Sequence, residues 1–143
     1  MADVFSKAKR SEIMSLIRAK NTQAERLVFS HLRSKKIYFQ KHYKGVPGCP
    51  DIALPKMKKA VFIDGDFWHG RDFDRVRRGK KANDYWVKKI RSNMDRDRKQ
   101  RAALRRSGWS IIRIWESELK RLKTRPSRLL KIEKFLNAST KYG

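Results

Sequence analysis

The four consecutive apolar residues Ala60-Val61-Phe62-Ile63 constrain the fold of this chain most strongly. A strand with water on one face alternates apolar and polar residues, whereas an unbroken run of this length is typical of a strand buried on both faces. Such a strand lies inside a sheet and needs other elements on both sides. The run therefore predicts an α/β protein with a mixed central sheet flanked by helices.

Helical spacing of apolar residues marks four further segments: residues 11–20, 22–35, 84–107 and a C-terminal helix that begins at Pro126. Thr22-Gln23-Ala24-Glu25 matches a capping box, which is a strong signal for a helix start. Strands are expected at residues 37–42, 51–54, 60–64 and 110–115. The predicted order is α-α-β-β-β-α-β-α in a single domain, residues 1–143.

The second and third strands are expected to form a hairpin that brings acidic oxygens together at one end. If residues 54 and 60 pair, Asp51 lies opposite Ile63. If the turn is one residue longer, Asp51 lies opposite Asp64. The pattern of residues does not choose between these two registers.

The charge of the chain indicates a polyanionic partner. Lysine and arginine number 38 against 14 acidic residues, so the formal net charge is +24, and the basic residues are spread over the whole length. Such a field favours nucleic acid or an anionic membrane surface. No segment approaches the roughly 20 apolar residues of a spanning helix, and the N-terminus lacks the apolar core of a signal peptide. We expect a cytoplasmic, nucleoid-associated protein that binds duplex DNA.

Asp51, Asp64 and His69 are the residues best suited to phosphodiester chemistry. Carboxylates hold Mg²⁺, which stabilises charge on a phosphate. Pro50-Asp51, followed by an acid at a strand end, resembles the Pro-Asp … Asp/Glu-x-Lys pattern of restriction-type endonucleases. The usual lysine is missing, but the imidazole of His69 can handle a proton near neutral pH.

Two more acids have a structural and a functional interpretation. Asp97 lies on the inward stripe of the helix predicted at residues 84–107, where it can pair with Arg101 one turn later or support the site. Glu25 is explained by its capping box, although it can also serve the site. Asp66 is predicted to be a solvated neighbour, whereas His31 and His42 are predicted to be a helix-face and a strand-end residue.

Along most of its length the chain resembles the very-short-patch repair (Vsr) DNA mismatch endonucleases. The residues that carry the resemblance are Met1-Ala2-Asp3-Val4 with Arg10-Ser11 and Met14, Glu25-Arg26-Leu27, Pro47-Gly48 with Pro50-Asp51, Val61-Phe62 with Gly65 and Phe67-Trp68-His69, Trp86 with Lys89-Ile90, Asn93 with Asp95-Arg96-Asp97-Arg98, and Gly108-Trp109 with Trp115-Glu116.

The resemblance implies a restriction-endonuclease-like fold, with a core of the PD-(D/E)xK type, and a magnesium-dependent nick 5′ to the thymine of a T:G mismatch. It would place Asp51 and the backbone carbonyl of Ile63 on one or two metal ions. His69 would be the base or its relay, supported by Asp97 and Glu25. The side chains wedged into the base stack would be Met14, Phe67 and Trp68.

Three departures from the family pattern matter. The family's second histidine falls at Asp64, which makes this position a candidate metal ligand. The family's structural zinc ligands fall at Asp66, near Arg71 and Phe73, and at Ser117, so no zinc is expected. The region 70–83 is the least similar. Two alternatives therefore stay open: a restriction-type or structure-insensitive nicking enzyme without mismatch specificity, and a non-catalytic basic nucleic-acid-binding module.

Replacement of Trp68 tests the predicted wedge. Trp68→Ala should lower the ratio of nicking rates on T:G-mismatched and matched duplexes, because stacking of a ring on a base is worth about 1–3 kcal/mol. Single-turnover nicking of both duplexes measures this ratio. A ratio equal to that of the parent protein would remove Trp68 from mismatch recognition.

Overall fold

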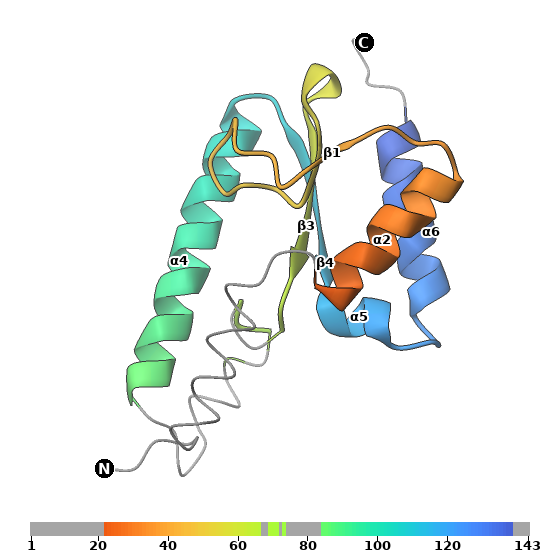
Figure 1. The fold of residues 1–143 in the computed structure, drawn as a ribbon. Helices are drawn as coiled ribbons and strands as arrows, with labels where there is room; N and C mark the ends of the chain where they lie inside the picture. The colour runs from red at the N-terminus through yellow and green to blue at the C-terminus, as the bar shows by residue number, and fades with distance from the viewer. Residues whose placement is uncertain (1–21, 67–68, 72, 74–83, 139–143) are drawn as a thin grey trace.

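The fold is described by a computed structural model that covers residues 22–66, 69–71, 73 and 84–138 (Figure 1). The helix predicted at residues 11–20 lies outside the described residues. So do the three predicted wedge residues Met14, Phe67 and Trp68.

The described strands form one mixed sheet in the order β1-β2-β3-β4. β1 (Gln40–Lys41), β2 (Ile52–Leu54) and β3 (Lys59–Asp64) pair antiparallel. β4 (Ser110–Trp115) pairs parallel with β3 after the long connection through α4 (Asp84–Arg106). The predicted mixed sheet in an α/β protein is confirmed, although the first strand is shorter than expected.

Helices cover both faces of this sheet (Figure 1). α4 lies on one face, and α2 (Gln23–Ser34), α5 (Glu116–Lys120) and α6 (Arg125–Asn137) lie on the other. All six residues of β3 are buried. The burial on both faces that the apolar run predicts is therefore present. The short helix α5 had no counterpart among the expected elements.

Alternate residues of β3 serve two separate cores, because successive side chains of a strand point to opposite faces. Val61 and Ile63 pack in the larger core, together with residues of α2, α5 and α6. Ala60 and Phe62 pack in the smaller core with Leu104 of α4 and with Trp109. The chain can thus place polar groups on either side of β3 where the strand ends at Asp64.

The hairpin has neither of the two registers expected from the sequence. Leu54 pairs with Lys59 and Ile52 with Val61, so the same register places Asp51 across from Phe62. The turn is shorter than expected because the 3-10 helix η1 (Pro55–Met57) is followed by Lys58 in the left-handed conformation, with φ of 52°. β3 can therefore start at Lys59.

The capping box at the start of α2 is confirmed. The Thr22 hydroxyl accepts a hydrogen bond from the Glu25 N–H, and Glu25 Oε2 accepts one from the Thr22 N–H, both at 3.3 Å. This reciprocal pair sets the position of Glu25 relative to the sheet. Among the helices in the described ranges, none is both long enough and apolar enough to cross a membrane.

Lys59 connects the start of β3 to the end of α6. Its side chain is 4% exposed, and burial lowers the pKa of its ammonium group. The Nζ atom donates to the carbonyls of Phe135 at 2.8 Å, Leu136 at 3.5 Å and Ala138. These are carbonyls of the last turn of the helix, where a cation is favourable.

Replacement of Lys59 by methionine should lower the free energy of unfolding by about 1–3 kcal/mol, because buried carbonyls would lose a charged donor. Urea unfolding measures the change. Lys56→Met is the matched control, since Lys56 lies in the same turn and is exposed. Equal unfolding curves for the two variants would show that Lys59 does not hold α6.

Candidate active site

Two groups of acids and histidines lie close to the end of β3. In each group, one potential ligand atom per residue lies within 4.8 Å of the others. The first group consists of Glu25, His42 and Asp51, and the second of Asp64, His69 and Asp97.

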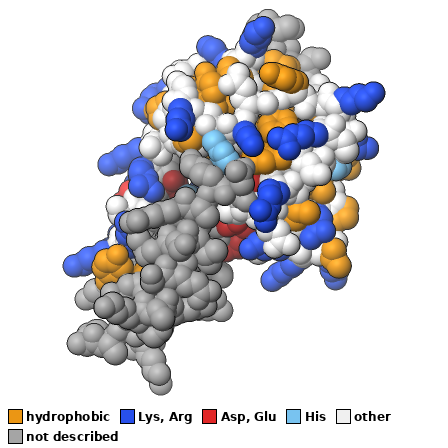
Figure 2. All heavy atoms as spheres, in the orientation of Figure 1, with side chains coloured by type: hydrophobic (Ala, Val, Ile, Leu, Met, Phe, Trp, Pro, Cys, Tyr) orange, Lys and Arg blue, Asp and Glu red, His pale blue; other side chains and the backbone are white. Residues whose placement is uncertain are grey.

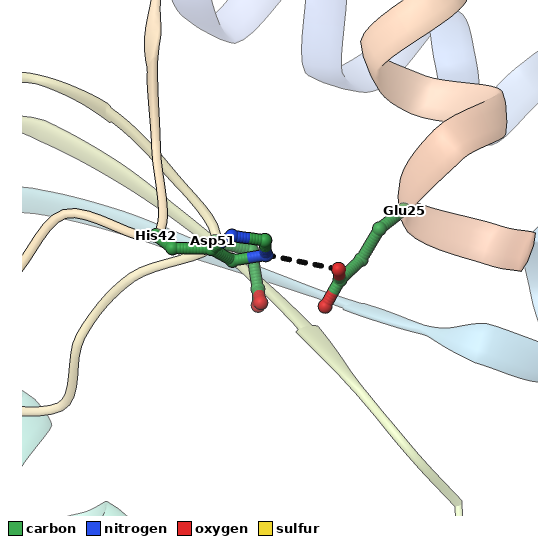
Figure 3. A group of neighbouring side chains, drawn as sticks. All are labelled: Glu25, His42 and Asp51. Atoms are coloured by element: carbon green, nitrogen blue, oxygen red, sulfur yellow. Dashed lines mark hydrogen bonds and ion pairs between the residues drawn. The ribbon is translucent and has the colours of Figure 1, made fainter. Parts of the chain in front are cut away.

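The first group joins α2 to the start of β2 (Figure 3). Glu25 reaches it from the first turn of α2, and its Oε2 atom lies 3.0 Å from His42 Nε2. The His42 N–H donates to the Asp51 carbonyl at 3.0 Å. Asp51 Oδ2 in turn accepts the backbone N–H of Ile63 at 2.7 Å. The carboxylate of Asp51 is thereby held at the edge of β3, just before the first residue of β2.

The surroundings of Asp51 are unfavourable for its negative charge. Burial raises the pKa of Asp51 well above its ordinary value, and a hydrogen bond with Glu25 and the charge of Glu25 raise it further. The hydrogen bond from Ile63 acts in the opposite direction but does not compensate. Two carboxyl groups held this close are stabilised when they share a proton or a cation.

The backbone carbonyl of Ile63 points to the same side of β3 as its N–H group, which is the side of Asp51. In a strand, the N–H and C=O of one residue face the same neighbour, and the N–H of Ile63 faces Asp51. Because β2 begins at Ile52, the carbonyl of Ile63 faces the region of Asp51 and Glu25. Carboxylate and carbonyl oxygens of this kind are the ligands that Mg²⁺ and other hard divalent cations take in proteins.

In the second group, the carboxylate of Asp64 is paired with two arginines. Arg101 donates to both of its oxygens, at 2.7 and 2.9 Å. Arg113 Nε lies 2.7 Å from Asp64 Oδ2. The Asp64 side chain is 3% exposed and that of Arg101 is 8% exposed. Asp64 is thus a buried and fully neutralised carboxylate, unlike Asp51.

His69 lies between the other two members of this group. Its Nδ1 atom is hydrogen-bonded to Asp97 Oδ2 at 2.5 Å, and its Nε2 atom lies 3.8 Å from Asp64 Oδ1. Burial by itself would raise the pKa of Asp97, but the hydrogen bond and charge of His69 and the nearby arginines lower it below its ordinary value. Asp97 is therefore an anion that can orient the imidazole ring.

The structure brings together the predicted site residues that it describes, but in two groups rather than one. Asp51 stands with Glu25, and Asp64 stands with His69 and Asp97. The charge of Asp64 still acts on Asp51. The expected pairing of Asp97 with Arg101 is only partly right, because the charge of Arg101 acts on Asp97 but its hydrogen bonds go to Asp64.

His42, Arg101 and Arg113 were not predicted as parts of the site. The sequence predicts only a strand-end residue at His42, but its imidazole contacts Glu25, which precedes it by 17 residues. Its backbone is left-handed, with φ of 49°, which no sequence pattern signals. The position of Arg101 on the inward stripe beside Asp97 was a usable signal, since a buried arginine needs an acid.

The positions that correspond to the family's zinc ligands contain a hydrogen-bonded network. Asp66 accepts the Ser117 hydroxyl at 2.6 Å, the Ser117 N–H at 3.1 Å and an Arg71 N–H at 3.1 Å. Arg71 also donates to the Ser117 hydroxyl at 2.8 Å. The prediction that Asp66 is a solvated neighbour is therefore wrong: it ties the segment after β3 to the start of α5.

Basic side chains surround the acidic groups. Lysines and arginines are spread over the face of the molecule seen in Figure 2, with few acidic side chains among them. The outer face of α4 carries a shallow hollow of about 560 Å³, and its basic lining residues are Lys88, Arg91, Arg96 and Lys99. A surface of this kind attracts the phosphates of a nucleic acid.

Comparisons with known proteins agree with this geometry. The family described as DNA mismatch endonuclease Vsr matches residues 2–75. The chain is 38% identical to the type II nicking enzyme V.XorIIP of Xanthomonas oryzae over 92% of this chain and 97% of that protein. It is 39% identical to V.NmeAIP of Neisseria meningitidis over 84% and 86%, and 31% identical to the DNA mismatch endonuclease Vsr of Escherichia coli over 84% and 77%.

The opposite environments of Asp51 and Asp64 predict opposite effects on stability. Asp64→Asn should lower the free energy of unfolding by about 3 kcal/mol, because it leaves two arginines without their anion. Asp51→Asn should leave the free energy of unfolding unchanged or raise it, because it removes a buried charge beside Glu25.

Urea unfolding near neutral pH, in the presence of a chelator, measures both changes. Asp95→Asn is the control, since Asp95 is an exposed acid on α4. An equal loss of stability in the variants of Asp51 and Asp64 would contradict the contrast drawn between them.

Proposed function

This chain belongs to the DNA mismatch endonuclease Vsr family, and on that premise we propose that it is a magnesium-dependent endonuclease that nicks one strand of duplex DNA at a T:G mismatch. The observation that carries the proposal is the carboxylate of Asp51, held by the N–H of Ile63 beside Glu25. The hydrogen-bonded pair of His69 and Asp97 lies near Asp64, the last residue of β3.

We also propose that the mixed sheet is a restriction-endonuclease-like core of the PD-(D/E)xK type. The support is positional. Pro50 and Asp51 precede β2, Asp64 ends the adjacent strand β3, and the two acids interact electrostatically. Helices on both faces leave the edge at the end of β3 as the place where both groups of polar side chains gather.

The residues of the first group fit a divalent metal ion. Burial and the neighbouring Glu25 raise the pKa of Asp51, so a bound cation would stabilise its charged form, and the carbonyl of Ile63 supplies a second hard oxygen on the same side. Asp51 and this carbonyl would hold the ion, with Glu25 in support. When bound, the ion would supply Lewis-acid stabilisation of the charge that develops on the phosphate. Magnesium is proposed because every oxygen donor here is hard.

The sequence left open whether Asp64 or the carbonyl of Ile63 is the second metal ligand. The contacts of Asp64 favour the carbonyl, since Arg101 and Arg113 already neutralise this carboxylate. A carboxylate that shares its oxygens with two guanidinium groups is a poor ligand for a further cation. Asp64 is therefore assigned to the arginines, and its metal-ligand role is the less favoured alternative.

His69 is proposed as the base or proton relay. Asp97 holds Nδ1, so that Nε2 is the nitrogen available for a proton. Nε2 would accept the proton of the attacking water while the new bond to phosphorus forms and the bond to the 3′ oxygen breaks. Asp97 stabilises the positive charge that the imidazole then carries. Its lowered pKa keeps it ionised for that role.

Recognition of the mismatch is proposed from the resemblance alone. Met14, Phe67 and Trp68 are the proposed wedge, and an apolar wedge that unstacks bases is an established way to kink a duplex.

A formal charge of +24 supports binding to the phosphates of duplex DNA, which would place the protein on the nucleoid. Several relatives are named as type II nicking enzymes rather than mismatch endonucleases, so nicking without mismatch specificity is the second candidate.

Nicking of strand-resolved duplexes tests the function. Matched and T:G-mismatched duplexes, each strand labelled separately, are incubated with Mg²⁺ or with a chelator. We expect one strand of the mismatched duplex to be nicked in Mg²⁺ only. Equal nicking of both duplexes would support the second candidate. Binding without any nicking would leave a non-catalytic basic nucleic-acid-binding module.

Asp51→Asn should abolish nicking and keep affinity for DNA, because it removes the proposed metal ligand without changing the basic surface. It should also abolish the rise in melting temperature that Mg²⁺ is expected to give the parent protein. Asp95→Asn, an exposed acid of the same charge, should change neither. Turnover of Asp51→Asn at the parent rate would exclude Asp51 from the site.

A further inference from the structure

We propose that Arg113 contacts the scissile phosphate and that Asp64 serves to position it. Arg113 lies on β4, directly beside Phe62 of β3 in the sheet. Its guanidinium lies beside both acids of the second group: Nε is 2.7 Å from Asp64 Oδ2, and Nη2 is 4.0 Å from Asp97 Oδ2. This inference rests on the proposed endonuclease function.

Arg113 is held in place through its Nε atom, which contacts Asp64, while its Nη2 atom lies 4.0 Å from Asp97 Oδ2. It is ion-paired with Asp64, and its Cζ atom lies 4.7 Å from the centre of the Trp115 ring. Among the described residues, no hydrogen bond from Arg113 accompanies these contacts. Its side chain is 37% exposed, so the N–H groups can reach a ligand. A guanidinium whose direction is set through Nε, and whose Nη donors make no hydrogen bond to the described residues, is suited to a phosphate.

Arg101 provides the contrast on the same carboxylate. It donates to both oxygens of Asp64, its side chain is 8% exposed, and its Cζ atom lies 4.0 Å from the centre of the Phe62 ring. Arg101 therefore satisfies the buried charge of Asp64 by itself. A second arginine at the same acid is not needed to neutralise one carboxylate, which leaves Arg113 for another role.

The position of Arg113 matches the place where a phosphate must lie. Asp64 lies 3.8 Å from Nε2 of His69, the nitrogen assigned to the attacking water, and it also contacts Arg113. A phosphate approached by that water would come next to the guanidinium. During the reaction, negative charge grows on the non-bridging oxygens of the phosphate. A positioned donor therefore stabilises the transition state more than the ground state.

Substitution of Arg113 tests the contact through the reaction rate. Arg113→Gln should lower the single-turnover nicking rate at saturating DNA by about 100- to 1000-fold, which is the usual loss for one such donor. Arg113→Lys should recover part of the rate, because it keeps the charge but not the fork of donors. The control is Arg106→Gln, an exposed arginine at the far end of α4, which should nick within about threefold of the parent.

A neutral phosphate separates direct contact from a structural role. The position of the nick is mapped first, and a single methylphosphonate is then placed there. In the presence of a chelator, the methylphosphonate should weaken DNA binding by the parent protein and by Arg106→Gln about tenfold, because one charged hydrogen bond is lost. It should not weaken binding by Arg113→Gln, which has already lost that contact.

The outcomes are distinct. An equal methylphosphonate penalty in Arg113→Gln and the parent, or an unchanged nicking rate, would overturn the role of Arg113 while leaving the endonuclease function intact. A parent protein that nicks neither duplex would instead overturn the proposed function. If Arg113→Gln melts below the assay temperature, the rate and the methylphosphonate penalty are measured on Arg113→Met, which also removes the charge and the donors: a rate and a penalty equal to those of the parent reject the contact.

Discussion

The hydrogen bond from the N–H of Ile63 to Asp51 is the interaction on which the site depends. It is made just before β2 begins at Ile52, beside a part of β3 that extends past the paired residues, so the N–H that would face a neighbouring strand faces a carboxylate instead. The same bond aims the carbonyl of Ile63 and sets Asp51 next to Glu25. A hairpin shifted by one residue would send the side chains of β3 to the opposite faces and separate these groups.

Asp51, next to the start of β2, and Asp64, at the end of β3, have opposite electrostatic surroundings. Asp64 has two arginines and contributes to stability, whereas Asp51 has Glu25 beside it and is raised in pKa by burial and by that neighbour. Buried acids are normally paired. An acid whose pKa is raised in this way is one that a bound cation would stabilise, and the contrast supports the proposal that Asp51 rather than Asp64 holds the metal ion.

The excess of basic residues makes the different surroundings of the acidic residues informative. A chain with 38 basic and 14 acidic residues could pair every acid with a cation. Glu25 and Asp51 lie close to each other in one group with His42, and Asp64, Asp66 and Glu118 each contact an arginine. The surrounding positive field draws in the phosphates of DNA, and the acidic group within it offers oxygens to a metal ion.

Local sequence patterns predict most of the helices and strands, whereas the contacts between their polar groups depend on how the chain packs. The apolar run 60–63, the capping box at Thr22 and the long stripe of α4 predicted a mixed sheet covered on both faces, because periodicity and capping are local properties. The resemblance also supplied Asp51, His69, Asp97 and Glu25 as candidates. The hairpin register, the contact of His42 with Glu25 and the pairing of Arg101 and Arg113 with Asp64 could not be predicted. They depend on a left-handed turn residue and on side chains brought together from distant segments, and no local pattern encodes either.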